Sequence, residues 1–158
     1  MLYERQPRGF NPSFETVACF LQRNGHFLLL LYQDGKPQSN RWGVPAGKVV
    51  DRERPVESME RELWEETGLD VMKKDISPFK TRFVRYPNGD FVFHMCGVRI
   101  YSNPIIILNP REHKGYQWST PGYSLDLPLV RDMDACIEDY FSLRPRRAFG
   151  TAHAHNYR

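Results

Sequence analysis

The chain has 158 residues, of which 26% are charged and 13% are aromatic, and its formal net charge is +3. This length fits one domain that buries roughly 70% of the surface its unfolded chain would expose. The composition excludes a disordered or fibrous protein. The small positive charge suits an anionic small molecule and makes no case for a nucleic-acid binder.

The sequence predicts a cytoplasmic protein with reduced thiols and no membrane partner. The first fourteen residues carry charges and no apolar run, unlike a signal peptide. The longest apolar run, residues 27–32, is far too short to cross a membrane. Cys19, Cys96 and Cys136 lack the spacing of a metal site or a redox motif.

A β-hairpin opens the expected fold. Residues 15–23 and 26–33 read as its two strands, and Asn24-Gly25 between them is a favoured hairpin turn. A polar loop, residues 34–41, then leads to a short strand around residues 42–45.

The next expected element is a helix between Pro55 and Gly68. Proline is favoured in the first turn of a helix, and glycine is favoured just past its end. Val56, Met59 and Leu63 recur at helical spacing and predict the apolar stripe that faces the core.

A second hairpin, another strand and a second helix complete the expected fold. The hairpin strands are residues 80–86 and 91–101, with Asn-Gly again in the turn. Residues 104–108, PIIIL, are a candidate for a further strand. Residues 132–143 alternate acidic and apolar residues at helical spacing, which predicts a helix packed on the sheet. The tail, residues 143–158, shows no period and is expected to be flexible.

Three glutamates crowd one face of the first predicted helix. Glu62, Glu65 and Glu66 are spaced so that their side chains meet, and like charges at this spacing destabilise a helix. Arg61 is expected to point to another side of the helix, so a hard divalent cation, Mg²⁺ or Mn²⁺, would compensate the carboxylates. The alternative interpretation is a solvated acidic face.

The residues around these glutamates resemble the Nudix box, G-x5-E-x7-R-E-U-x-E-E-x-G-U, where U is aliphatic. Gly47, Glu53 and residues 61–69 occupy its specified positions. The similarity to Nudix hydrolases covers roughly residues 15–142 and leaves residues 1–14 as an N-terminal extension. It implies an α/β fold, the Nudix-type α/β/α sandwich around a mixed β-sheet.

The resemblance also implies a metal site. Glu62, Glu65 and Glu66 would bind Mg²⁺ or Mn²⁺ together with the carbonyl of Ala46. Glu112, on a later loop, would complete the site or act as general base, so that Glu65, Glu66 and Glu112 are the expected catalytic residues.

Two further residues of the box are expected to have a structural role. Glu53 and Arg61 would brace the preceding loop against the helix.

The phosphate contacts are less clearly marked. Relatives often carry a basic residue at the end of the second strand, where this chain has Tyr32 and Gln33. Lys36, Arg41 or Lys48 would then contact the substrate phosphates, of which Lys48 and Arg41 are the candidates taken forward; the alternative is that each is a solvated loop residue. His113 is either an aid to proton transfer or a surface loop residue.

Neighbouring markers of substrate class do not agree. Tyr86 lies where dinucleoside-polyphosphate hydrolases often have tyrosine, and Pro87 lies near the spacing associated with ADP-ribose hydrolases. Neither decides the substrate.

Two functions are compatible with the sequence. The favoured one is a metal-dependent hydrolase that cleaves the pyrophosphate linkage of a nucleoside diphosphate linked to another group, X. Nucleotide sugars, ADP-ribose, dinucleoside polyphosphates and nucleoside triphosphates are all such substrates. The alternative is a Nudix domain that binds a nucleotide for sensing or regulation without cutting it. The base, X and the oligomeric state, monomer or homodimer, stay open.

Overall fold

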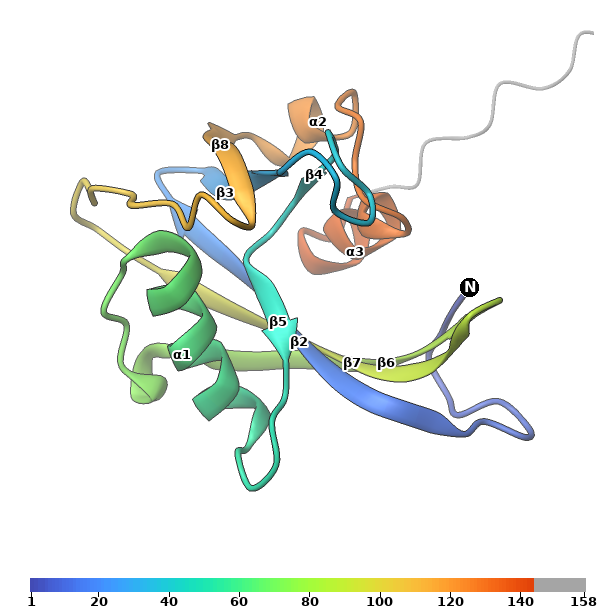
Figure 1. Ribbon diagram of the computed structural model, residues 1–158. Coiled ribbons are helices and arrows are strands. Elements are labelled where there is room, and N and C mark those ends of the chain that lie inside the picture. Colours follow the sequence, from blue (N-terminus) through green and yellow to red (C-terminus); the bar gives the residue numbers. More distant parts are fainter. Residues whose placement is uncertain (144–158) are drawn as a thin grey trace, which may run out of the picture.

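The computed structural model of the chain describes residues 1–143 (Figure 1). The predicted tail, apart from Leu143, lies outside the described residues. The strands are β1 (Leu2–Tyr3), β2 (Pro12–Arg23), β3 (His26–Tyr32), β4 (Trp42–Gly43), β5 (Ala46–Lys48), β6 (Ser77–Tyr86), β7 (Gly89–Arg99) and β8 (His113–Ser119). The helices are α1 (Pro55–Thr67), the short 3-10 turn η1 (Lys73–Asp75), α2 (Pro121–Ser124) and α3 (Met133–Tyr140).

The strands form one mixed sheet in the order β1-β6-β7-β2-β3-β4, with β5 paired to β2 and β8 paired to β3. The long strands β2 and β7 run parallel, whereas the other pairs are antiparallel. Both predicted hairpins, β2–β3 and β6–β7, are confirmed.

The central strand β2 divides the core into two layers, because successive side chains of a strand point to opposite faces. Val17, Cys19 and Leu21 pack with the apolar stripe of α1, whereas Ala18 and Phe20 pack with α3. Figure 1 shows α1 and α3 on opposite sides of the sheet. The predicted fold class, a mixed sheet with helices on both faces, is confirmed.

The first predicted helix, α1, has the expected ends. Pro55 begins it, and Gly68 follows it with a left-handed φ of 70°, a conformation that favours glycine. Met59 and Leu63 are fully buried under the sheet. The helix therefore turns a fixed face, which includes the glutamates, toward β5.

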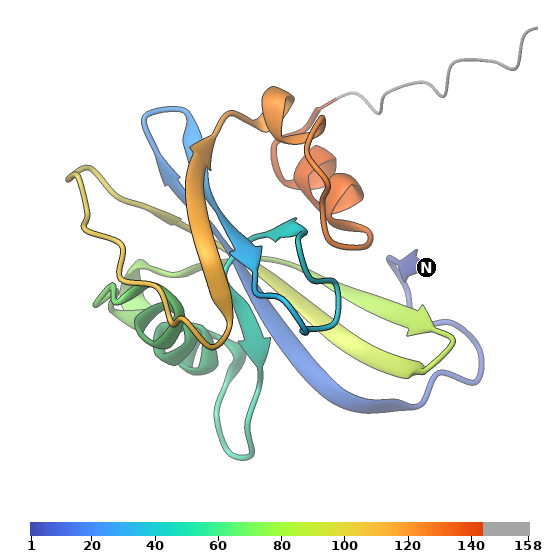
Figure 2. The ribbon, with the colours of Figure 1, turned by 45° about the horizontal axis from the view of Figure 1, so that its top comes forward.

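Residues 104–108 do not form the expected strand. Ile105 and Ile107 are exposed, Ile106 is buried, and the segment lies against the end of α1, where the amide of Ile107 donates to the carbonyl of Thr67 at 2.8 Å. The strand that instead covers the free edge of β3 is β8, which Figure 2 shows running alongside it. The sequence did not predict β8.

Within residues 1–143, no helix is long and apolar enough to cross a membrane. Cys19, Cys96 and Cys136 are buried and not disulfide-bonded.

Candidate active site

The centre of the site is the carboxylate of Glu66, which α1 places against β5. Its Oε2 accepts a hydrogen bond from the amide of Ala46 at 2.9 Å, and the residue is only 7% exposed. Because β5 is fixed to β2 in register, Ala18 opposite Ala46, the position of this amide is set by the centre of the sheet. The role of the Ala46 carbonyl as a metal ligand stays a prediction, because the contact with Glu66 is made by the N–H of Ala46.

Glu66 is poorly compensated as an anion. Burial raises its pKa to about 8, the amide of Ala46 opposes this shift, and the charges of Glu62, Glu112 and Glu65 add to it. Among residues 1–143, the one basic side chain within ion-pair distance of Glu66 is His113, whose Nδ1 lies 3.9 Å from Oε1. The carboxylate therefore lacks the positive partner that its burial would require at neutral pH.

His113 does not supply that charge. It begins β8, is 2% exposed, and packs its ring on Tyr32 at a centroid distance of 4.8 Å. Burial lowers its pKa to about 4, so the imidazole is neutral at pH 7. Neither ring nitrogen has a hydrogen-bond partner in the described part of the chain. The expectation of a surface loop residue was wrong, because His113 is an inward position of a strand that the sequence did not reveal.

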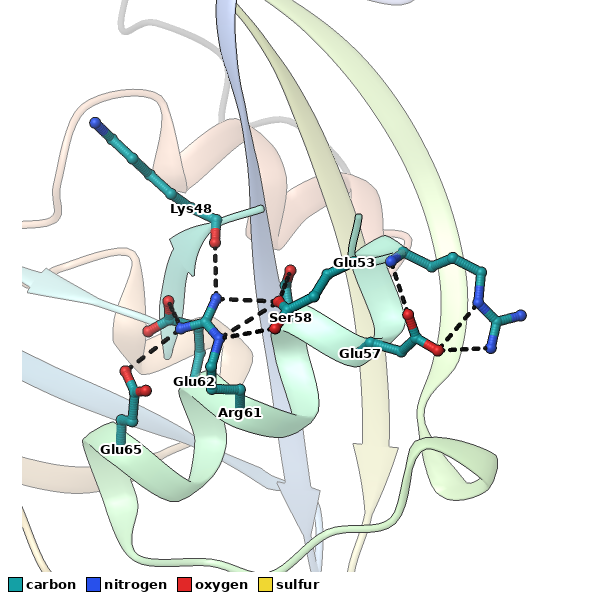
Figure 3. A network of polar contacts seen from close by, with 8 residues as sticks. Lys48, Glu53, Glu57, Ser58, Arg61, Glu62 and Glu65 are labelled. Atoms are coloured by element: carbon teal, nitrogen blue, oxygen red, sulfur yellow. Dashed lines mark hydrogen bonds and ion pairs between the residues drawn. The ribbon is translucent and has the colours of Figure 1, made fainter. Parts of the chain in front are cut away.

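Arg61 forms ion pairs with Glu53, Glu62 and Glu65, as Figure 3 shows. Its Nη1 lies 2.8 Å from Glu62 and 3.4 Å from Glu65, and its Nη2 lies 3.3 Å from Glu53. The Nη2 group also donates to the carbonyl of Lys48 at 3.0 Å. The expectation that Arg61 points away from the cluster was wrong, because a long, forked guanidinium reaches several neighbours at once.

The contact between Arg61 and Glu53 joins α1 to the loop before it. Glu53 also accepts a hydrogen bond from Ser58 at 2.6 Å, and these contacts lower its pKa. The brace role of the pair stays a prediction, but its geometry is of the kind such a role needs.

Glycine is required at position 47 because the side chain of Glu62 lies very close to the backbone there. A Cβ atom built on Gly47 would lie 1.9 Å from Cδ of Glu62. Any larger residue would therefore push the Glu62 carboxylate out of its place beside β5.

Glu112 comes to the site from a later part of the chain than α1 and β5. It directly precedes β8, its carbonyl accepts the amide of Gln33 at 2.9 Å, and its Oε1 accepts from Nζ of Lys36 at 2.8 Å. Its charge contributes to the raised pKa of Glu66 and opposes the lowered pKa of His113. The side chain is 40% exposed, so it is open to solvent and substrate.

The two candidate phosphate contacts differ in position. Lys48 follows Ala46 and Gly47 on the wall of a cavity, with its Nζ 4.9 Å from the ring centre of Phe14. Arg41 instead donates to the carbonyl of Leu129 at 3.2 Å and is not part of that wall. The structure thus brings Lys48, but not Arg41, to the site.

The cavity has a volume of about 270 Å³ and lies on the α3 side of the sheet. One part of its wall is Ala46–Lys48, which contacts Glu66 and Arg61 through its backbone. Phe91 and Phe93 contribute apolar surface, and Tyr86 and Asp132 contribute polar groups. Asp132 and Tyr86 come from elements far apart in the chain, so no sequence pattern groups them.

The donor set fits a hard divalent cation. Carboxylate oxygens are the ligands that Mg²⁺ and Mn²⁺ prefer, and a nearby cation would relieve the uncompensated burial of Glu66. Among residues 1–143, no three acidic, histidine or cysteine side chains already stand grouped around a metal position. Glu62 and Glu65 are instead turned toward Arg61.

Comparisons with known proteins identify the family of this chain. The model of the NUDIX domain family matches residues 12–140. The phosphatase NudJ of Escherichia coli strain K12 is 37% identical over 78 residues, which cover 45% of this chain and 50% of that protein. The chain thus spans about half the length of the curated relatives it matches.

Solved structures share the fold at low sequence identity. The MutT protein from Methanosarcina mazei Go1 has a TM-score of 0.69 at 23% identity, with 84% of this chain and 94% of that chain covered. A C. elegans Ap4A hydrolase binary complex has a TM-score of 0.66 at 17% identity, with 82% and 96% covered.

A third structure contains a nucleotide and a metal. It is a bifunctional NMN adenylyltransferase/ADP ribose pyrophosphatase from Francisella tularensis, complexed with AMP and Mn ion. Its TM-score is 0.67 at 20% identity, with 85% of this chain and 42% of that chain covered.

Proposed function

Since this chain belongs to the NUDIX domain family, we propose that it is a divalent-metal-dependent hydrolase of the pyrophosphate linkage in a nucleoside diphosphate linked to another group, X. The observation that carries this proposal is the uncompensated Glu66 carboxylate beside Ala46 and Gly47, which also line a cavity of about 270 Å³. The strand β5 thus contacts the carboxylates that would bind a metal and a diphosphate, and it also lines the pocket that would hold an organic group.

The metal would be held by Glu62, Glu65 and Glu66, with Glu112 from the opposite side. When bound, Mg²⁺ or Mn²⁺ compensates the charge of the diphosphate and lowers the pKa of a bound water. Arg61 already holds Glu62 and Glu65 within 3.4 Å, so it limits how far these two carboxylates spread.

The remaining steps belong to side chains of this protein. Lys48 would attract the phosphates, and its position after Ala46 and Gly47 on the cavity wall supports this role. Glu112 would take the proton of the attacking water as the P–O bond to the leaving phosphate breaks. The contact of Glu112 Oε1 with Nζ of Lys36 at 2.8 Å would hold this carboxylate in position.

The volume of the cavity supports a single nucleoside as the group that is bound there. Its volume lies just below the roughly 300–1,000 Å³ of small-molecule sites, so it would hold one nucleoside rather than a whole dinucleotide. X would then extend past the carboxylates toward solvent. The named activities of two structural neighbours make Ap4A and ADP-ribose natural members of a first substrate panel.

The test is product analysis for nucleotide sugars, Ap4A, ADP-ribose and nucleoside triphosphates with Mg²⁺. Wild type should cleave at least one at a P–O–P linkage, and Glu65→Gln should lose this activity. Glu60→Gln is the matched control, because Glu60 lies on the same helix but accepts from the amide of Lys73. Binding without turnover across the panel would instead favour the sensing domain.

A further inference from the structure

The side-chain ammonium of Lys36 is paired with Glu112, the candidate base. Its Nζ lies 2.8 Å from Oε1 of Glu112, and the two side chains are 36% and 40% exposed. An ion pair this open to solvent is weak, because water screens both charges. A general base accepts its proton on an oxygen lone pair, and the contact engages one of the two carboxylate oxygens. The free protein thus keeps its candidate base in a contact that a stronger partner can replace.

The loop that carries Lys36 is fixed by other contacts. Lys36 lies between β3 and β4, and the amide of Gln33 at the start of this loop donates to the carbonyl of Glu112 at 2.9 Å. Lys114 on β8 lies 2.9 Å from the carboxylate of Asp34 and so holds the loop at a second point. Neither contact uses the side chain of Lys36. Its four-carbon stem is flexible, so the ammonium can move while the backbone stays in place.

The charge of Lys36 acts on the region around the Glu66 carboxylate. It contributes to the lowered pKa of His113, whose Nδ1 lies 3.9 Å from Oε1 of Glu66. The ammonium has three N–H donors, and one of them is used by Glu112. A diphosphate that binds at the carboxylates of α1 brings several anionic oxygens into this region, and charge-assisted hydrogen bonds to phosphate are strong. The diphosphate is therefore a better partner for Lys36 than a single exposed carboxylate.

We propose that Lys36 exchanges partners during substrate binding, an inference that rests on the proposed function. In the free protein it holds Glu112 in position, and when a diphosphate binds, its ammonium moves to a phosphate oxygen. The exchange leaves both carboxylate oxygens of Glu112 free, so the base becomes available only once the substrate is in the site. The ligand that drives the exchange is the diphosphate group, whichever base and group X are attached to it.

The experiment is a double-mutant cycle of Lys36→Met and Glu112→Gln, read by calorimetric binding of methylenediphosphonate in saturating Mg²⁺. The P–C–P bridge of this probe resists hydrolysis, and thermal melts verify that each variant folds. Lys36→Met should weaken binding about tenfold, as expected for the loss of one charge-assisted hydrogen bond.

The second substitution should have an effect that depends on Lys36. The change in affinity caused by Glu112→Gln should be about threefold more favourable with Lys36 present than in the Lys36→Met background, because only then does it release an ammonium from an ion pair. Effects of Glu112 on metal binding or on charge repulsion are common to both backgrounds and cancel in the cycle.

Lys114→Met is the matched control, because Lys114 has the same charge and a similar ion pair but binds Asp34 instead of Glu112. Its affinity for the probe should stay within about twofold of wild type. In steady-state assays Lys36→Met should raise KM and leave kcat little changed, because Glu112 is intact. Equal affinity of wild type and Lys36→Met, an equal loss in Lys114→Met, the same effect of Glu112→Gln in both backgrounds, or no binding to wild type would overturn the proposal.

These readouts separate the proposal from the function on which it rests. The cycle measures binding of a probe that is not cleaved, so coupling between Lys36 and Glu112 without turnover of any nucleotide would contradict the proposed function alone. Cleavage of a nucleotide of the panel with no coupling in the cycle would contradict the exchange by Lys36 alone.

Discussion

Replacing Glu66 with glutamine should stabilise the metal-free protein at pH 7.5. Burial raises the pKa of Glu66 from 4.5 to about 8 in the folded chain. In the unfolded chain the carboxyl ionises near its ordinary value. Between these two values the folded state holds a proton that the unfolded state has released, so this group lowers the free energy of unfolding as pH rises from 4.5 to about 8.

The size of the effect follows from the shift. At 1.36 kcal/mol per pKa unit, Glu66 lowers the free energy of unfolding by about 4 kcal/mol at pH 7.5. A glutamine can still accept from Ala46, but its amino group would be buried near Nδ1 of His113, which costs about 1–3 kcal/mol if unsatisfied. The net gain is about 1–3 kcal/mol, or about 2–12 °C in the melting temperature for a domain of this size.

The assay is thermal and urea unfolding of both proteins in EDTA between pH 5 and pH 8. The advantage of Glu66→Gln should grow with pH, and near pH 5 the variant should be no more stable than wild type. Adding Mg²⁺ should stabilise wild type more than the variant, because the variant lacks a charged ligand. A Glu66→Gln protein less stable than wild type at pH 7.5, or a difference independent of pH, would refute the reasoning.

The same contacts predict the behaviour of four other variants. Glu65→Gln should melt like wild type, because its carboxylate is 50% exposed, yet lower kcat by several orders of magnitude in steady-state assays. Glu53→Gln should lower the melting temperature, since it weakens the contact with Arg61. An unchanged melting temperature would contradict the structural role of this pair. Gly47→Ala should displace Glu62 and weaken Mg²⁺ binding by calorimetry, and unchanged affinity would count against the close approach. Glu112→Gln should lower kcat about a hundredfold with little change in KM, and a loss of only a few-fold would exclude it as the base.

The helix and the hairpins could be predicted because their signals are local. Pro55 and Gly68 mark the ends of α1, and Asn-Gly turns mark both hairpins. These residues act through backbone geometry within a few positions, so no knowledge of the rest of the fold is needed.

The strand beside β3 could not be chosen in the same way. Residues 104–108 are more apolar than 113–119, yet the second segment fills the edge. A strand exists only where another strand can pair with it, and this depends on how the chain returns to the sheet. The alternation of Tyr116 and Trp118 was the one local hint of β8.

The residues of the box were predicted from the sequence, but their local electrostatics were not. The sequence placed Glu62, Glu65 and Glu66 on one face. In the structure Glu62 and Glu65 contact Arg61, whereas Glu66 contacts the amide of Ala46, and the reach of Arg61 depended on a side-chain conformation that spacing does not fix. The burial of His113 and the hydrogen bond from Tyr86 to Asp132 both depend on contacts between distant elements. Such contacts leave no pattern in the sequence.

The central claim is that the carboxylates of α1 serve a metal-dependent cleavage of a P–O–P linkage. The most direct measurement is the rate of phosphate-product formation from the best substrate of the panel, in Mg²⁺ and in excess EDTA. The account predicts turnover in Mg²⁺ that stops in EDTA and returns when Mg²⁺ or Mn²⁺ is restored. Undiminished turnover in excess EDTA would contradict it.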